Sequence, residues 1–149
     1  MPAKHFKKIV MLILLTAIWG CDQSPKKNEA SYMGLKADEA AYSAFIKSNG
    51  LLFVSGQTGT GSVKGIKNSF DKETHLAIKR IITILYINSL STEDVINTTV
   101  YLTDIKYFET FDKIYRQYFK TPFPTRTCVI VKELEQKANI EITVVASAE

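Results

Sequence analysis

The spacing of hydrophobic residues changes several times between residues 42 and 146, and each change predicts an element of secondary structure. Short apolar or alternating runs predict strands, and apolar residues three and four positions apart predict helices. Strands are expected near 42–47, 51–55, 95–103, 127–131 and 140–146, and helices near 69–88 and 104–119. The segment from Gly56 to Gly65 holds four glycines and is expected to be a loop.

Both expected helices carry an apolar stripe on one side. The stripe residues are Ala77, Ile78, Ile81, Ile82 and Leu85 in the first helix, and Phe108, Phe111, Tyr115 and Tyr118 in the second. The order β-β-α-β-α-β-β predicts an α+β fold in which two helices cover one face of a mixed sheet. The other face of that sheet is also apolar in this chain, so we expect an oligomer that covers it.

The N-terminus has the pattern of a signal peptide. Lys4, Lys7 and Lys8 precede a nearly uninterrupted apolar run over residues 9–20. Twelve helical residues reach about 18 Å, short of a membrane core of roughly 30 Å, so the run is too short to span. The sequence Ile18-Trp19-Gly20-Cys21 that follows resembles a bacterial lipobox, although Trp19 is bulkier than usual. An ordinary signal peptide with an incidental cysteine is the alternative.

Three segments are therefore expected. Residues 1–20 form the signal, residues 21–36 form a polar tether, and residues 37–149 form the folded domain. Lipidation of Cys21 would anchor the protein to a membrane of the cell envelope. It would also leave Cys128 as a lone thiol.

The net charge of +4 comes mostly from the signal segment. Removing its three lysines from the 19 basic residues leaves 16 against 15 acidic residues. A nearly neutral domain argues against a nucleic-acid partner, because nucleic-acid binding rests on phosphate neutralisation.

Two charged residues are placed where they could bind a ligand. Arg126 follows the Phe123-Pro124 segment at the start of a strand and shares a face with Cys128 and Ile130. It is either a surface residue at a strand end or a two-pronged donor for a carboxylate. Glu141 lies between two isoleucines in the last strand. It is either a solvent-facing position or a functional carboxylate.

Cys128, on an apolar strand, fits a small core residue better than a nucleophile, because no histidine lies near it in the sequence. The two cysteines and two histidines of the chain offer little for a metal site.

Several motifs occur in one order along the chain. They are Tyr42, the run Ser55-Gly56-Gln57, the run Pro124-Thr125-Arg126-Thr127-Cys128 and the run Ile140-Glu141-Ile142. Taken together, over about residues 38–148, they resemble the RidA/YjgF family of enamine and imine deaminases.

The resemblance implies a chorismate-mutase-like homotrimer with sites between subunits, which hydrolyses 2-imino acids without metal or organic cofactor. It implies that Arg126 binds the substrate carboxylate, that Glu141 and the main chain around Cys128 hold the attacking water, and that Tyr42 and Ser55 line the cleft.

Three residues depart from the family pattern. The usual Gly-Pro before Tyr42 is Ala40-Ala41, the usual asparagine of the second helix is Asp112, and the usual glycine after the first helix is Ser89. Two other functions stay open. One is a non-catalytic module in the envelope that binds a small carboxylated metabolite. The other is the ribonuclease activity once associated with the family, against which the neutral charge counts.

Overall fold

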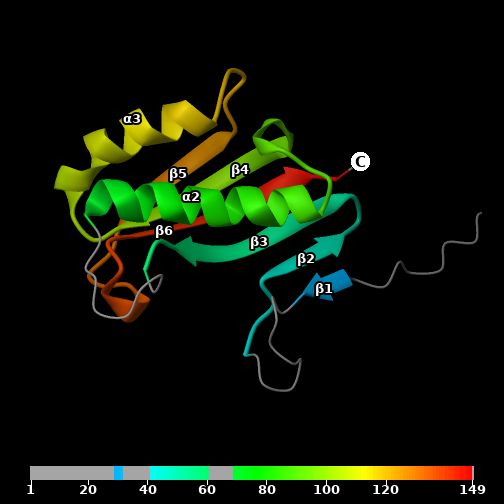
Figure 1. Ribbon diagram of the computed structural model, residues 1–149, viewed down its shortest axis with the longest axis horizontal. Coiled ribbons are helices and arrows are strands. Elements are labelled where there is room, and N and C mark those ends of the chain that lie inside the picture. The colour runs from blue at the N-terminus through cyan, green and yellow to red at the C-terminus, as the bar shows by residue number, and fades with distance from the viewer. Residues whose placement is uncertain (1–28, 32–40, 61–68, 149) are drawn as a thin grey trace, which may run out of the picture.

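The computed structural model describes residues 29–31, 41–60 and 69–148, which form a mixed sheet and two helices (Figure 1). The strands are β1 (Glu29–Ser31), β2 (Phe45–Ser48), β3 (Leu51–Thr58), β4 (Val95–Leu102), β5 (Thr125–Ile130) and β6 (Ile140–Ser147). Their order in the sheet is β1-β2-β3-β6-β4-β5, and only β4 and β5 pair in parallel. The helices are α2 (Phe70–Ile87) and α3 (Phe108–Tyr118). The predicted α+β fold is confirmed.

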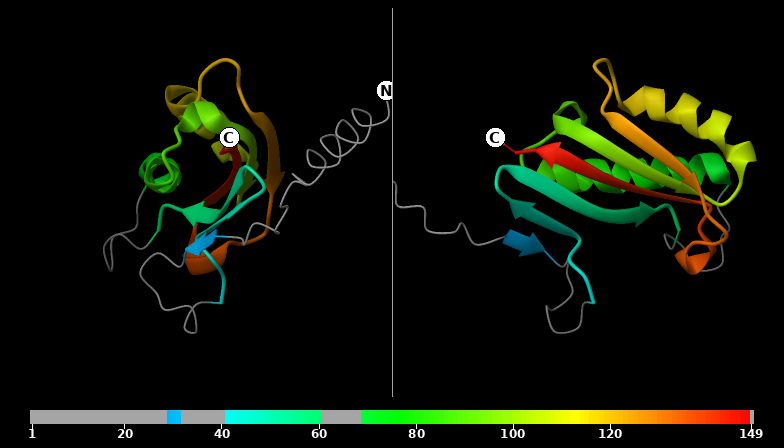
Figure 2. Two further views of the ribbon diagram at one scale, coloured as in Figure 1. Left: turned by 90° about the vertical axis from the view of Figure 1, so that its right-hand side faces the viewer. Right: turned by 180° about the vertical axis from the view of Figure 1, so that it is seen from behind.

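Both helices lie on the same side of the sheet, as Figure 2 shows edge-on and from behind. Alternation along β6 separates the two faces, because side chains of a strand point to opposite sides in turn. Ile140, Ile142 and Val144 are buried under the helices, whereas Glu141 and Thr143 point to the other face. We call the face that no described helix covers the open face.

The open face carries hydrophobic side chains on each strand from β2 to β6, interspersed with threonines of β4, β5 and β6, so it is apolar only in part. Phe53 pairs with Ile46 on one side and with Val145 on the other, so these three side chains share it. Tyr101 and Val129 continue it across β4 and β5. Phe53 is 44% exposed and Val129 39% exposed, so the open face presents hydrophobic surface to its surroundings.

Helix α2 ends at a residue for which glycine is the natural choice. Ser89, directly after the C-cap Asn88, has a φ of 61°, in the left-handed region. The glycine that the family pattern expects there would adopt this angle without strain. The serine adopts it too, and its N–H donates to the carbonyl of Tyr86.

The structure differs from the sequence prediction in three places. Strand β3 continues through Gly56 to Thr58, where a loop was expected, because a bulge after Val54 lets Gln57 and Thr58 pair with β6. Strand β1 lies within the segment expected to be an unstructured tether and pairs with β2. Asp104 caps a short 3₁₀ turn that precedes α3 rather than α3 itself.

The signal segment, Cys21, and residues 22–28 and 32–36 of the tether lie outside the described residues. No helix in the described part of the chain is both long and apolar enough to cross a membrane.

Candidate functional site

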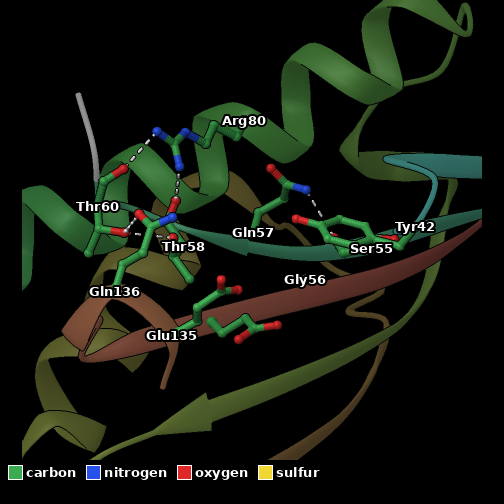
Figure 3. A pocket seen from close by; sticks show the side chains of 10 residues that line it. Tyr42, Ser55, Gly56, Gln57, Thr58, Thr60, Arg80, Glu135 and Gln136 are labelled. Carbon is green, nitrogen blue, oxygen red and sulfur yellow. Dashed lines mark hydrogen bonds between the residues drawn. The ribbon is translucent and has the colours of Figure 1, made fainter. Parts of the chain in front are cut away.

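A cavity of about 600 Å³ surrounds the second half of β3 (Figure 3). Within β3, only the first half pairs with β2, so the segment after Ser55 has no strand on that side among the described residues. Residues from α2, β6 and the turn before β6 line the cavity beside it. Its lining includes three of the predicted site residues, Tyr42, Ser55 and Glu141.

Glu141 lies against Gly56 in this cavity. A Cβ atom at Gly56 would be 1.7 Å from the Oε1 atom of Glu141, so any larger residue there would displace the carboxylate. The glycine of the Ser55-Gly56-Gln57 motif is therefore needed for the position of Glu141. The motif and the carboxylate therefore form one structural unit, although Gly56 and Glu141 are 85 residues apart in the sequence.

The two other predicted residues in the cavity are held in different ways. The hydroxyl of Ser55 donates to the carbonyl of Ser43 over 2.6 Å, which ties β3 to the loop before β2. Tyr42 stands on that loop and is 69% exposed. Its side chain is therefore accessible from the cavity.

Arg80 of α2 lines the same cavity and was not predicted from the sequence. Its Nη1 and Nη2 atoms donate to the carbonyls of Thr58 and Thr60 over 2.7 and 2.8 Å (Figure 3). These two bonds satisfy carbonyl groups at the end of β3, where regular strand pairing stops. Arg80 therefore fixes the rim of the cavity and adds a positive charge to a wall that also holds Glu135 and Glu141.

A buried carboxylate fixes the start of β6. Glu73 of α2 is 2% exposed and accepts two hydrogen bonds from Asn139, one from its backbone N–H at 2.6 Å and one from its side-chain Nδ2 at 2.9 Å. The Oδ1 atom of Asn139 accepts from the hydroxyls of Thr103 and Tyr107, each over 3.4 Å. Since Glu141 follows Asn139 by two residues, this network fixes the backbone position of β6 from which the Glu141 side chain extends.

Arg126 lies elsewhere, on the side of the sheet that carries the helices. Its Nη1 atom is 2.9 Å from Oδ1 of Asp112 on α3. Its guanidinium carbon lies 4.9 Å from the ring centre of Tyr115 and 5.3 Å from that of Phe111, within cation–π range. A smaller cavity of about 300 Å³ borders this group. The arginine is thus held by an ion pair and by aromatic rings.

Cys128 is next to Arg126 on the same face of β5, opposite Val100 of β4. Burial raises the pKa of the Cys128 thiol, and the positive charge of Arg126 opposes this shift only in part. A raised pKa keeps the sulfur protonated at neutral pH and makes it a poor nucleophile. The structural interpretation of this cysteine is favoured.

The structure does not bring Arg126 and Glu141 together within one subunit. Arg126 pairs with Thr98 and Glu141 with Tyr101, three residues further along β4 and on the other side of it. Strand geometry puts their Cα atoms roughly 14 Å apart. Their side chains also point to opposite faces of the sheet, since Thr98 is buried under α3 and Tyr101 is on the open face. Sequence alternation could not show this, because it does not tell which face the helices cover.

Among the described residues, no group of three or more His, Cys, Asp and Glu side chains is placed to hold a metal ion.

Comparison with known proteins adds a consistent set of matches. A family model described as Endoribonuclease L-PSP matches residues 35–148. A RutC family protein of Aquifex aeolicus (strain VF5) is 38% identical over 108 residues, which are 70% of this chain and 86% of that protein. The chloroplastic Reactive Intermediate Deaminase A of Arabidopsis thaliana is 34% identical over 128 residues, covering 83% of this chain and 67% of that protein. The crystal structure of E. coli TdcF with bound serine has a TM-score of 0.67 and 28% identity, and the match covers 72% of this chain and 88% of that chain.

Proposed function

Because the chain belongs to the Endoribonuclease L-PSP family, which includes Reactive Intermediate Deaminase A, we propose that it hydrolyses 2-imino acids to 2-oxo acids and ammonia. We further propose that each site forms between two copies of the chain. One copy contributes the Arg126 pocket and its neighbour contributes the cavity around Glu141.

The reaction asks little of the protein beyond placement. In R–C(=NH₂⁺)–COO⁻ + H₂O → R–CO–COO⁻ + NH₄⁺, water attacks the carbon of an already electrophilic iminium, and the C–N bond breaks. Arg126 would hold the carboxylate with its planar donor edge, and Glu141 would orient the water and accept its proton. Holding two small reactants in line is an established source of rate enhancement.

The observation that carries this proposal is the division of the predicted residues into two incomplete half-sites. The cavity around Glu141 holds a carboxylate that could serve as general base, and the Arg126 pocket holds a guanidinium that could bind a carboxylate. The open face, on which Glu141 lies, also carries partly exposed hydrophobic side chains, which suits contact with a second copy. A homotrimer, as the family resemblance implies, would join the two half-sites at each of its interfaces.

A second candidate function is a binding module without catalysis. The observation that favours it is the ion pair between Arg126 and Asp112, which occupies part of the carboxylate-binding edge. E. coli TdcF was crystallised with serine, an amino acid that such a module could also bind.

The test is release of ammonia and 2-oxo acid from imino acids that an amino-acid oxidase generates in the assay. We expect the full chain to accelerate this hydrolysis, and Arg126→Ala to lower kcat/KM at least ~10-fold, since a charge-assisted contact contributes about 1.5–3 kcal/mol. Arg126→Lys should keep only part of the wild-type kcat/KM, because an ammonium group lacks the planar pair of donors that a guanidinium offers. Glu141→Gln should lower kcat more than it raises KM. A folded wild type without acceleration would favour the binding module.

We propose that the protein acts in the cell envelope, attached through lipid on Cys21. The short apolar run before Gly20 and Cys21 supports this proposal. Cells that express the full chain should incorporate a fatty-acid analogue into it, and Cys21→Ala should abolish the label. Equal labelling of both forms would exclude Cys21 as the attachment site.

A further inference from the structure

Asp112 occupies part of the guanidinium edge of Arg126 that a ligand carboxylate is expected to use. Its Oδ1 atom is 2.9 Å from Nη1 of Arg126, and its Oδ2 atom accepts from Nε of Arg116, four residues along α3, over 2.8 Å. The side chains of Asp112 and Arg126 are only 23% and 24% exposed, and both line the 300 Å³ cavity with Phe123. A fixed negative charge is thus built into the wall beside the expected carboxylate anchor.

Both charged groups keep unused hydrogen-bonding capacity. A carboxylate oxygen has two acceptor positions, and each oxygen of Asp112 uses one of them for an arginine. The guanidinium of Arg126 has five N–H donors, and its ion pair with Asp112 is the only polar contact it makes to a described residue. The two residues can therefore bind one ligand together, Arg126 with its remaining N–H donors and Asp112 with its remaining acceptor positions.

The charge on Asp112 persists at working pH. The hydrogen bond from Arg116, and to a smaller extent that from Arg126, hold the pKa of Asp112 below its ordinary value. A ligand carboxylate on the remaining N–H groups of Arg126 would lie about 5 Å from a permanent anion. That anion weakens the binding of such a ligand to Arg126 unless the ligand carries a positive charge close to its own carboxylate.

We propose that Asp112 makes the Arg126 pocket selective for zwitterions, in which a carboxylate binds Arg126 and a cationic nitrogen on the adjacent carbon binds Asp112. A protonated 2-imino acid has this arrangement, because its C=NH₂⁺ carbon is bonded directly to the carboxylate carbon. The 2-oxo acid product has lost the nitrogen and keeps only the negative charge. Asp112 would therefore favour binding of the substrate and release of the product. Naming these two ligands rests on the proposed function, whereas the charge selectivity does not.

The experiment compares pyruvate with L-alanine, which share a three-carbon carboxylate and differ in having a keto oxygen or an ammonium group. Binding of each to the full-length wild type and to Asp112→Asn is measured by isothermal titration calorimetry at one pH and ionic strength. The expected result is that Asp112→Asn binds pyruvate about tenfold more tightly, because two like charges about 5 Å apart at a partly exposed site repel by roughly that amount. L-Alanine should bind Asp112→Asn more weakly than wild type.

Glu109→Gln is the matched control, since Glu109 is an exposed carboxylate one turn earlier on α3. It should leave both affinities unchanged, whereas equal effects of the two variants would reduce the result to general surface charge and overturn the proposal. Affinities that move in the same direction for both ligands, or a wild type that binds neither ligand, would also overturn it. Imine hydrolysis is measured on the same samples. Selective binding without hydrolysis by the wild type would reject the proposed function and leave the role of Asp112 supported.

Discussion

The placement of Arg126 and Glu141 on opposite faces of the sheet leads to a subunit-mixing experiment. Two variants, Arg126→Ala and Glu141→Gln, are purified separately and then mixed in equal amounts under conditions that exchange subunits. Each variant alone should be nearly inactive, because every site would lack one of the two groups. After exchange, some sites join the intact Arg126 of one variant to the intact Glu141 of the other.

The expected recovery follows from how many copies one site needs. Within a subunit the two Cα atoms lie roughly 14 Å apart and the side chains diverge, so one small imino acid cannot touch both. If each site takes Arg126 from one copy and Glu141 from its neighbour, random exchange restores about one quarter of the sites. Imine hydrolysis should therefore recover to about one quarter of the wild-type rate, whatever the number of subunits.

A double variant provides the control. Mixing Arg126→Ala/Glu141→Gln with an equal amount of wild type should also leave about one quarter of the wild-type rate if sites lie between copies, and about one half if each copy holds a complete site. Sedimentation must show that all mixtures keep the same assembly. No recovery in the first mixture, together with one half in the second, would refute the shared site.

Three further predictions concern single residues. Gly56→Ala should lower the rate of imine hydrolysis and the thermal stability, since the added Cβ collides with the side chain of Glu141. The loss of stability should vanish when Glu141→Ala is added, and a loss that persists would mean that the collision lies elsewhere. Glu73→Gln should lower the free energy of unfolding in urea by about 1–3 kcal/mol, because an amide cannot accept both N–H groups of Asn139; Asp71→Asn, exposed in the same turn, should not change it. Arg116 and Arg126 lower the pKa of Asp112, so the stability that Asp112 contributes is present above the ordinary aspartate pKa of 3.8 and is lost as the pH falls below that value. In an acid titration followed by circular dichroism, the stability advantage of wild type over Asp112→Asn should therefore shrink below pH 3.8.

The hydrophobic pattern predicted the helices and most strands because those elements bury one face against a single core. It failed at Gly56–Thr58 for a physical reason. Glycines predict a loop, whereas here the strand continues because β6, distant in sequence, offers partners beyond a bulge. The polar β1 segment has no pattern of its own, and it becomes a strand by pairing with the edge of β2.

The site was predictable only where motifs were available. Tyr42, Ser55 and Glu141, taken from the family resemblance, do meet in one cavity. Arg80 and Glu73 carried no motif, since their roles depend on the backbone atoms that the fold brings to them. The separation of Arg126 from Glu141 depended on which face the helices cover, and that is a property of the packed sheet.

Opposite faces also restrict the symmetry of any assembly that completes the site. A two-fold axis brings a surface patch against itself, so it does not readily join two patches on opposite sides of a subunit. Head-to-tail contact does join them, and it ends only when the copies close into a ring. A closed ring leaves no half-site unmatched. An open chain of copies would carry an unmatched Arg126 pocket at one end and an unmatched Glu141 cavity at the other, so only closure of the ring would give every copy a complete site.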